Sequence, residues 1–120
     1  KIREITTTKE NKPIPIHLET SGVDQISGNP NWITLSPKKH APPCIQLIKA
    51  CQELKVVIHE KDDLAFAEKI ANKTRKFKRP LFFLQPGWNN ETGRKLAYEY
   101  VKSNPKWRLS MQTHKWLKVL

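Results

Sequence analysis

Short apolar runs that end in polar clusters recur along this chain and alternate with segments of helical spacing. The run at residues 81–85 is nearly continuous, which is typical of a strand buried in a parallel sheet. The run at 107–113 alternates apolar and polar positions, which is typical of a half-buried strand. The pattern predicts five strands, at residues 14–19, 32–36, 54–59, 81–85 and 107–113.

Three helices are predicted between the strands, at about residues 42–53, from residue 62 onwards, and from Asn89 or Asn90 to about residue 102. Two prolines open the first helix, an acidic pair lies at the positive end of the second, and asparagine caps the third. The predicted fold class is α/β. We expect a partial (β/α) barrel or an open, mostly parallel sheet of about five strands and three helices.

The 120 residues allow one domain, residues 1–120. No apolar run approaches the roughly 20 residues that span a bilayer, so no membrane segment is expected. The chain starts at Lys1 without an initiator methionine or a targeting pattern. We expect a cytoplasmic protein, and a piece of a longer one.

The net charge is +11, and the densest basic cluster is the run at residues 73–79. One interpretation is an RNA-binding surface, in which Phe77, Trp88 and Trp116 stack on bases. Another is a solvated helix end, where cations also suit the helix dipole. A substrate or cofactor that bears phosphate would be a third explanation.

The two cysteines, Cys44 and Cys51, lie seven residues apart in a segment with helical spacing. Seven residues make two helical turns, so both thiols are expected on one face with Ile48, as buried structural groups. There is no CxxC motif, and no histidine lies nearby at ligand spacing. No metal site is therefore expected in this chain.

Polar residues follow the ends of the predicted strands, where α/β proteins place their chemistry. Such a rim suits a polar small molecule rich in heteroatoms, although loops are polar in most proteins. Among the histidines, His114 is the most suggestive, His17 is expected to be structural, and His59 could face solvent or a site. The rim residues are Glu19, Ser21, Ser36, Lys38, Gln85, Gln112 and His114.

Five stretches resemble 7-carboxy-7-deazaguanine synthase. They are Leu-Glu-Thr-Ser-Gly at 18–22, Leu-Ser-Pro-Lys at 35–38, Glu-Leu-Lys-Val-Val at 53–57, Leu-Gln-Pro at 84–86 and Trp-Arg-Leu-Ser-Met-Gln-Thr-His-Lys at 107–115. The last stretch is the most specific. The resemblance covers nearly the whole chain and preserves the order of the motifs.

The resemblance implies a cytoplasmic homodimer with a reduced TIM-type barrel. It also implies a radical S-adenosylmethionine enzyme that uses a [4Fe-4S] cluster, S-adenosylmethionine and Mg²⁺. The family converts 6-carboxy-5,6,7,8-tetrahydropterin to 7-carboxy-7-deazaguanine, with loss of ammonia, in queuosine and deazapurine biosynthesis.

Carried over to this chain, the resemblance assigns two groups of site residues. Those expected near S-adenosylmethionine are Glu19, Thr20, Ser21, Ser36 and Lys38. Those expected near the pterin are Gln85, Gln112, His114 and Leu120, the last through its carboxylate.

One departure from the family concerns the cluster. The family holds it with three cysteines that include a CxxC pair near the N-terminus, and neither Cys44 nor Cys51 matches that motif. The early Gly-Gly-Glu stretch of the family is also missing. We therefore expect this chain to be the C-terminal half of such an enzyme, inactive alone and paired with an N-terminal half or a second copy.

Overall fold

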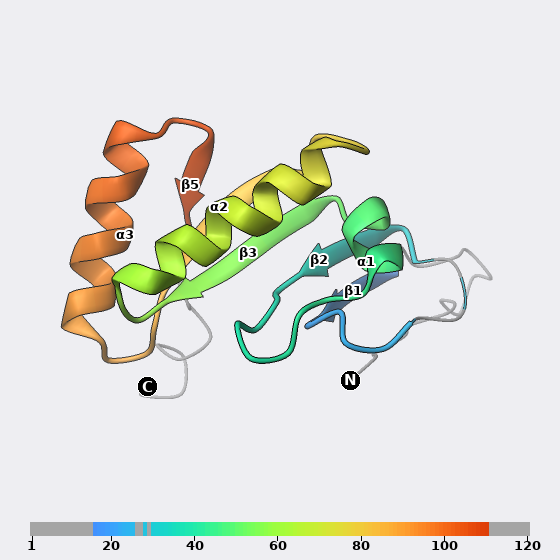
Figure 1. Cartoon of the computed structure of the whole chain (residues 1–120), viewed down its shortest axis with the longest axis horizontal. Coiled ribbons are helices and arrows are strands. Elements are labelled where there is room, and N and C mark those ends of the chain that lie inside the picture. Colours follow the sequence, from blue (N-terminus) through green and yellow to red (C-terminus); the bar gives the residue numbers. More distant parts are fainter. Residues whose placement is uncertain (1–15, 26–27, 29, 111–120) are drawn as a thin grey trace, which may run out of the picture.

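The computed structural model describes residues 16–25, 28 and 30–110. Their strands form one open sheet in the order β1-β2-β3-β4-β5, and every neighbouring pair is parallel (Figure 1). The predicted fold class is confirmed. The elements are β1 (His17–Thr20), β2 (Trp32–Leu35), α1 (Ile45–Ala50), β3 (Glu53–Ile58), α2 (Lys61–Arg75), β4 (Leu81–Pro86), α3 (Glu91–Ser103) and β5 (Trp107–Leu109).

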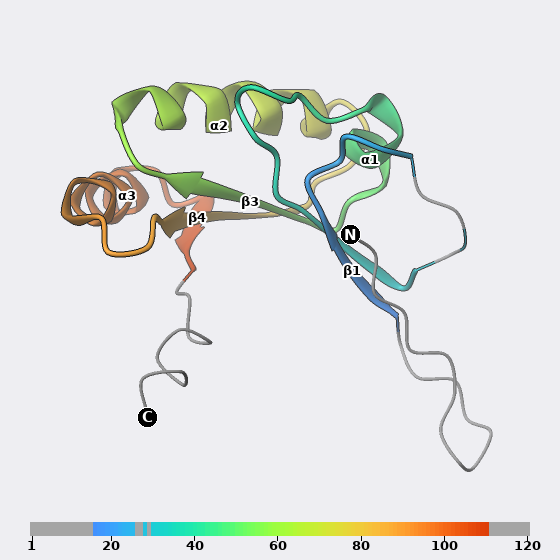
Figure 2. The ribbon, with the colours of Figure 1, turned by 90° about the horizontal axis from the view of Figure 1, so that it is seen from below.

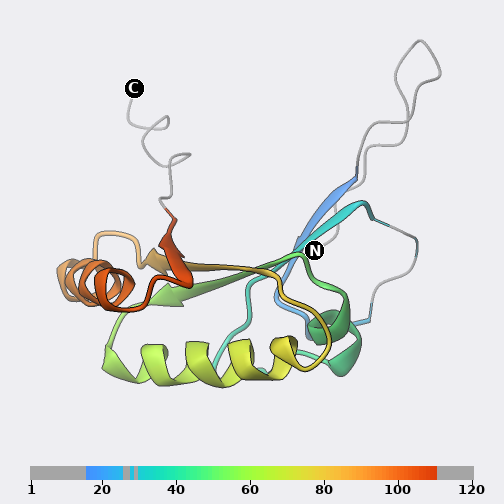
Figure 3. The same ribbon diagram turned by 90° about the horizontal axis from the view of Figure 1, so that it is seen from above.

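The helices leave one face of the sheet uncovered. Figures 2 and 3 show α1 and α2 on one side, with α3 beside the β4–β5 end, and the described residues place no helix on the opposite side. Alternate residues of β3, among them Leu54 and Val56, are buried towards the helices and pack with Ile70 of α2. The residues between them face the uncovered side, because side chains alternate along a strand.

Both long helices begin where the sequence predicts. The Asp63 Oδ2 atom accepts hydrogen bonds from the backbone N–H groups of His59 and Glu60, which caps α2. The Asn90 Oδ1 atom accepts from the Gly93 N–H and caps α3. Asn89, the alternative cap, has a left-handed φ of 54° and precedes the helix.

The first helix is shorter than predicted. It covers only Ile45–Ala50, and Cys44 and Cys51 flank it with extended backbone. The expectation that both thiols share a helical face with Ile48 is therefore wrong. The reason is the sheet: Gln52 donates its N–H to the Ile33 carbonyl, so the chain must extend before β3 begins. Both cysteines are free, and Cys51 is buried.

A carboxylate ties the last two elements to α2. Glu68 accepts hydrogen bonds from the Tyr100 hydroxyl, the Trp107 indole N–H and the Lys106 ammonium. Trp107 is only 1% exposed, and its ring lies 5.2 Å from that of Phe82. Residues 111–113 of the predicted last strand and residues 14–15 of the first lie outside the described residues.

Candidate functional site

The side of the sheet that the described helices leave uncovered carries both polar and apolar side chains. We call it the helix-free face and define it by its polar residues Glu19, Thr34, Glu53, Lys55 and Gln85. In β3, Glu53 and Lys55 alternate with the buried Leu54 and Val56, so their side chains point away from the helices. Lys55 and Glu53 are not among the site residues predicted from the sequence. Their alternation with apolar neighbours was the signal that could have identified them.

Most of the charged and polar groups of this face are paired with one another, with Gln85 as the exception among the described residues. The Lys55 Nζ atom lies 2.9 Å from Glu19 Oε2. The Thr34 hydroxyl, which is buried, donates to Glu53 Oε1 at 2.5 Å. Since that hydroxyl has one proton, it accepts from His17 Nε2, 2.9 Å away, and Nε2 carries the proton. His17 thus has a structural partner across two strands, as its position in a strand indicates.

Backbone contacts bring the carboxyl ends of β1 and β2 together. The Ser36 N–H donates to the Thr20 carbonyl at 2.8 Å, and the Gly22 N–H donates to the Thr20 hydroxyl at 3.1 Å. Gly22 has a φ of +81°, and a Cβ there would lie 2.6 Å from Leu35 Cδ1, so only glycine fits this turn. The predicted residues Glu19, Thr20, Ser21 and Ser36 therefore lie in one region.

The loop that follows β2 is held by an ion pair that the sequence analysis missed. The Lys39 Nζ atom lies 2.9 Å from Asp63 Oδ1 and 3.4 Å from Glu60 Oε2. Burial acts to raise the pKa of Asp63, but hydrogen bonds from the His59 N–H, Lys39 and the Glu60 N–H outweigh it and lower that pKa. Lys38, the neighbouring predicted site residue, is exposed.

Gln85 lies farther along the sheet than the β1 and β2 residues. The register aligns Glu19 with Thr34, Glu53 and Leu81, and Gln85 comes four residues after Leu81. At about 3.3 Å per residue this offset is about 13 Å along the strand direction, so the structure does not bring Gln85 beside Glu19. Its side chain is buried, and within the described part of the chain its amide has no hydrogen-bond partner.

The other residues predicted to contact the pterin, Gln112, His114 and Leu120, lie outside the described residues. His59 follows β3, is exposed, and packs its ring against Gly87, where a Cβ would lie 2.3 Å from the imidazole. This contact holds the β4–α3 loop close to the carboxyl end of β3.

The residues present do not fit an iron–sulfur cluster. Burial raises the pKa of the Cys51 thiol to about 11, which disfavours the thiolate that would ligate iron. Across residues 16–25, 28 and 30–110, no three His, Cys, Asp or Glu side chains gather in a way that could hold a metal. None of the described helices is both long and apolar enough to cross a membrane.

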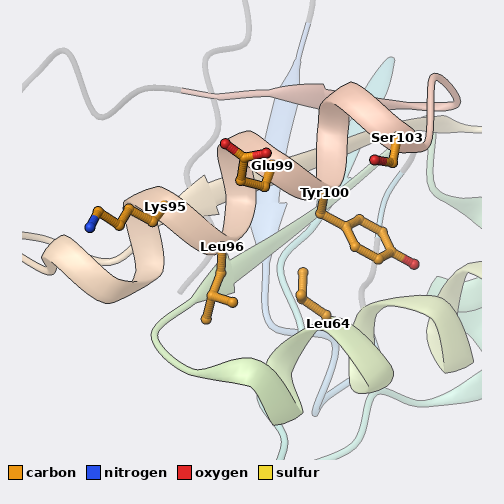
Figure 4. Close-up of a pocket in the computed structure, with 6 residues that line it drawn as sticks. All are labelled: Leu64, Lys95, Leu96, Glu99, Tyr100 and Ser103. Carbon is orange, nitrogen blue, oxygen red and sulfur yellow. The ribbon is translucent and has the colours of Figure 1, made fainter.

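A concavity lies on the helical side of the molecule. It is a groove of about 340 Å³ between α2 and α3, with an apolar floor that includes Leu64, Leu96 and Tyr100 (Figure 4). Lys95, Glu99 and Ser103 lie at its rim. It contains none of the predicted site residues.

Comparison with known proteins yields relatives that share one name. A 7-carboxy-7-deazaguanine synthase of Prochlorococcus marinus is 53% identical over 99% of this chain, and one of Flavobacterium psychrophilum is 41% identical over 88%. The crystal structure of QueE from Escherichia coli superposes with a TM-score of 0.69 at 27% identity and covers 80% of this chain. No family model matches the sequence.

The chain spans only part of these relatives. It covers 59% of the Prochlorococcus protein, 50% of the Flavobacterium protein and 44% of the QueE chain. The resemblance drawn from the sequence motifs is confirmed. Over nearly its whole length, the chain is similar to about half of a 7-carboxy-7-deazaguanine synthase.

Proposed function

We propose that this chain is the C-terminal half of a 7-carboxy-7-deazaguanine synthase that acts in the cytoplasm. The complete enzyme would convert 6-carboxy-5,6,7,8-tetrahydropterin to 7-carboxy-7-deazaguanine, as a radical S-adenosylmethionine lyase. The observation that carries the proposal is the 53% identity to the Prochlorococcus synthase over 99% of this chain. A helix-free face with fixed polar groups supports it, because half of a barrel would present its lumen in this way.

The carboxyl ends of β1 and β2 would bind S-adenosylmethionine. Glu19 supplies a carboxylate for N–H and O–H donors, Lys38 a cation for the carboxylate of the cofactor, and Ser36 a hydroxyl. The Thr20 hydroxyl holds the turn after β1 by accepting the Gly22 N–H, and Ser21 in that turn is proposed as a further contact of the cofactor. S-adenosylmethionine, when bound, supplies the radical that starts the ring contraction.

The carboxyl end of β4 would contact the pterin. Gln85 presents both a carbonyl and an amide NH₂, which match the donor and acceptor edge of a pterin. Among the described residues the Gln85 amide has no partner, and an unpaired buried amide costs about 1–3 kcal/mol, so a ligand that pairs with it would gain affinity and discrimination. Gln112, His114 and the Leu120 carboxylate are proposed as further pterin contacts.

The cluster and Mg²⁺ would be bound outside this chain's described residues. Because Cys44 and Cys51 do not fit the cluster, its ligands would come from an N-terminal half, either on the same polypeptide or on a partner. The complete enzyme is proposed to be a homodimer.

A chimera tests the proposal. The 120 residues would replace the matching part of the Prochlorococcus synthase, and the purified chimera, with its cluster reconstituted, would be assayed for 7-carboxy-7-deazaguanine by mass spectrometry. We expect product from the chimera and none from either half alone. A folded chimera with the cluster's absorbance and no product would contradict the proposal.

Matched variants in the chimera separate the two binding regions. Ser36→Ala should raise the dissociation constant of S-adenosylmethionine, whereas Ser103→Ala at the end of α3 should not. Gln85→Met should raise the KM for the pterin and leave the affinity for S-adenosylmethionine unchanged. If Ser36→Ala and Ser103→Ala change the dissociation constant of S-adenosylmethionine equally, Ser36 does not belong to the binding site.

The alternative reading, an RNA-binding module, finds no support in the relatives named above, which are synthases. The basic run at residues 73–79 covers the last turn of α2 and the segment after it, where cations suit the helix dipole.

A further inference from the structure

The loop between β2 and α1 is tethered at three points. At its two ends, the Ser36 N–H donates to the Thr20 carbonyl and the Cys44 N–H donates to the Gly22 carbonyl, so both ends are tied to β1 and the turn after it. In its middle, the Lys39 Nζ atom lies 2.9 Å from Asp63 Oδ1. Lys39 therefore ties the middle of the loop to the first turn of α2.

The partner of Lys39 is fixed independently of it. The Asp63 side chain is only 8% exposed, and its other oxygen accepts the N–H groups of His59 and Glu60 at 2.8 and 3.0 Å. The carboxylate thus keeps its place when Lys39 is changed. Asp63 is therefore held at the carboxyl end of β3 by backbone hydrogen bonds, and Lys39 forms its ion pair with a carboxylate that is already in place.

We propose that the Lys39–Asp63 ion pair positions the β2–α1 loop so that Ser36 and Lys38 are ordered before S-adenosylmethionine binds. This inference rests on the proposed function of that loop. Lys39 is directed to Asp63, so it acts as a positioning residue. Without the pair, the loop must lose its conformational freedom on binding, and that loss lowers the affinity.

The test uses the chimera described above. Lys39→Gln should raise the dissociation constant of S-adenosylmethionine about fivefold, the scale of one partly exposed ion pair. Amide hydrogen exchange at residues 36–41 should become faster, and Lys39→Arg should restore both measurements. Lys69→Gln removes the same charge from the exposed side of α2 and should change neither.

A double-mutant cycle ties the effect to the pair. Asp63→Asn should weaken binding to a similar extent, and Lys39→Gln combined with Asp63→Asn should weaken it no further. Additive losses, or an equal loss in Lys69→Gln, would overturn the inference.

Two outcomes separate this inference from the function on which it rests. Failure of the unmutated chimera to bind S-adenosylmethionine would overturn the proposed function, and the inference with it. Binding by the unmutated chimera that Lys39→Gln leaves unchanged would overturn the positioning role alone.

Discussion

At the scale of single residues, a few carboxylates hold elements that are distant in sequence. Glu68 joins α2 to α3 and β5 through three donors, and Asp63 joins α2 to the end of β3 and to the β2–α1 loop. Burial, and then Glu68, raise the pKa of Tyr100 to about 12, so its hydroxyl stays a donor at neutral pH. The sequence predicts the place of Asp63 at the start of α2, but it does not reveal the contact of Asp63 with Lys39 or the three donors of Glu68.

Removal of Glu68 should be costly. Glu68→Ala leaves the buried Trp107 N–H and the half-buried Tyr100 hydroxyl without their acceptor, and we expect a loss of about 2–3 kcal/mol in the free energy of unfolding. Urea titration followed by circular dichroism measures it. Glu99→Ala on the exposed side of α3 serves as the control, with an expected change within about 0.5 kcal/mol. Equal urea midpoints for Glu68→Ala and Glu99→Ala would disprove the stabilising role of Glu68.

The same two acids predict how stability depends on pH. Hydrogen bonds lower the pKa of Asp63 and of Glu68 in the folded chain, despite the opposing effect of burial. A lowered folded pKa stabilises the protein above the unfolded pKa of about 4, and that stability is lost as pH falls through the folded pKa. The free energy of unfolding should therefore decrease below about pH 5, and Glu68→Gln should flatten that decrease. An unchanged slope in this variant would contradict the prediction.

At the scale of elements, close backbone contact seats α3 on β3. Gly93 in the first turn of α3 faces the Ile58 carbonyl oxygen, and a Cβ at Gly93 would lie 2.1 Å from that oxygen. A glycine inside a helix usually costs about 1 kcal/mol relative to alanine, so its presence here reflects the contact.

Gly93→Ala should therefore destabilise the chain, although alanine favours helices. We expect the free energy of unfolding to fall by about 2 kcal/mol, because α3 must move away from β3. Thr92→Ala, one residue earlier and exposed, isolates the helix propensity and should be neutral or slightly stabilising. A gain in stability with Gly93→Ala would show that α3 has room to shift.

The sequence predicts most helices and strands well, but it does not predict where α1 begins and ends or how far Gln85 lies from Glu19 along the sheet. Apolar runs such as 81–85 and capping residues such as Asn90 are local signals, and they mark β4 and α3 correctly. The short α1 depends on the pairing of Gln52 with β2, a contact that is distant in sequence. The four-residue offset of Gln85 from the level of Glu19 depends on strand register, which no residue of either strand encodes alone.

At the scale of the whole molecule, the described helices cover one face of the sheet and leave the other open, and we propose that a partner covers the open face. The helix-free face is polar near Lys55 and Glu19, but Trp32 and Leu81, at the amino ends of β2 and β4, are 37% and 38% exposed. Among the described residues, the outermost strands β1 and β5 each pair with one neighbour, and an outer strand edge can add another strand. The proposed N-terminal half would cover both features.

Self-association of the isolated chain tests this view. We expect the 120-residue chain to sediment with a concentration-dependent mass, because the exposed Trp32 and Leu81 and the outer edges of the described sheet favour pairing with a second copy. Trp32→Thr removes the exposed aromatic ring but places a β-branched residue, which suits a strand, at this position, and it should shift association to higher concentration. Tyr98→Gln, which removes an exposed aromatic from α3, should not. Addition of the N-terminal part of the Prochlorococcus synthase should replace the self-associated species with a 1:1 complex. If the chain stays monomeric at all concentrations and does not bind the N-terminal part, the helix-free face does not require a partner.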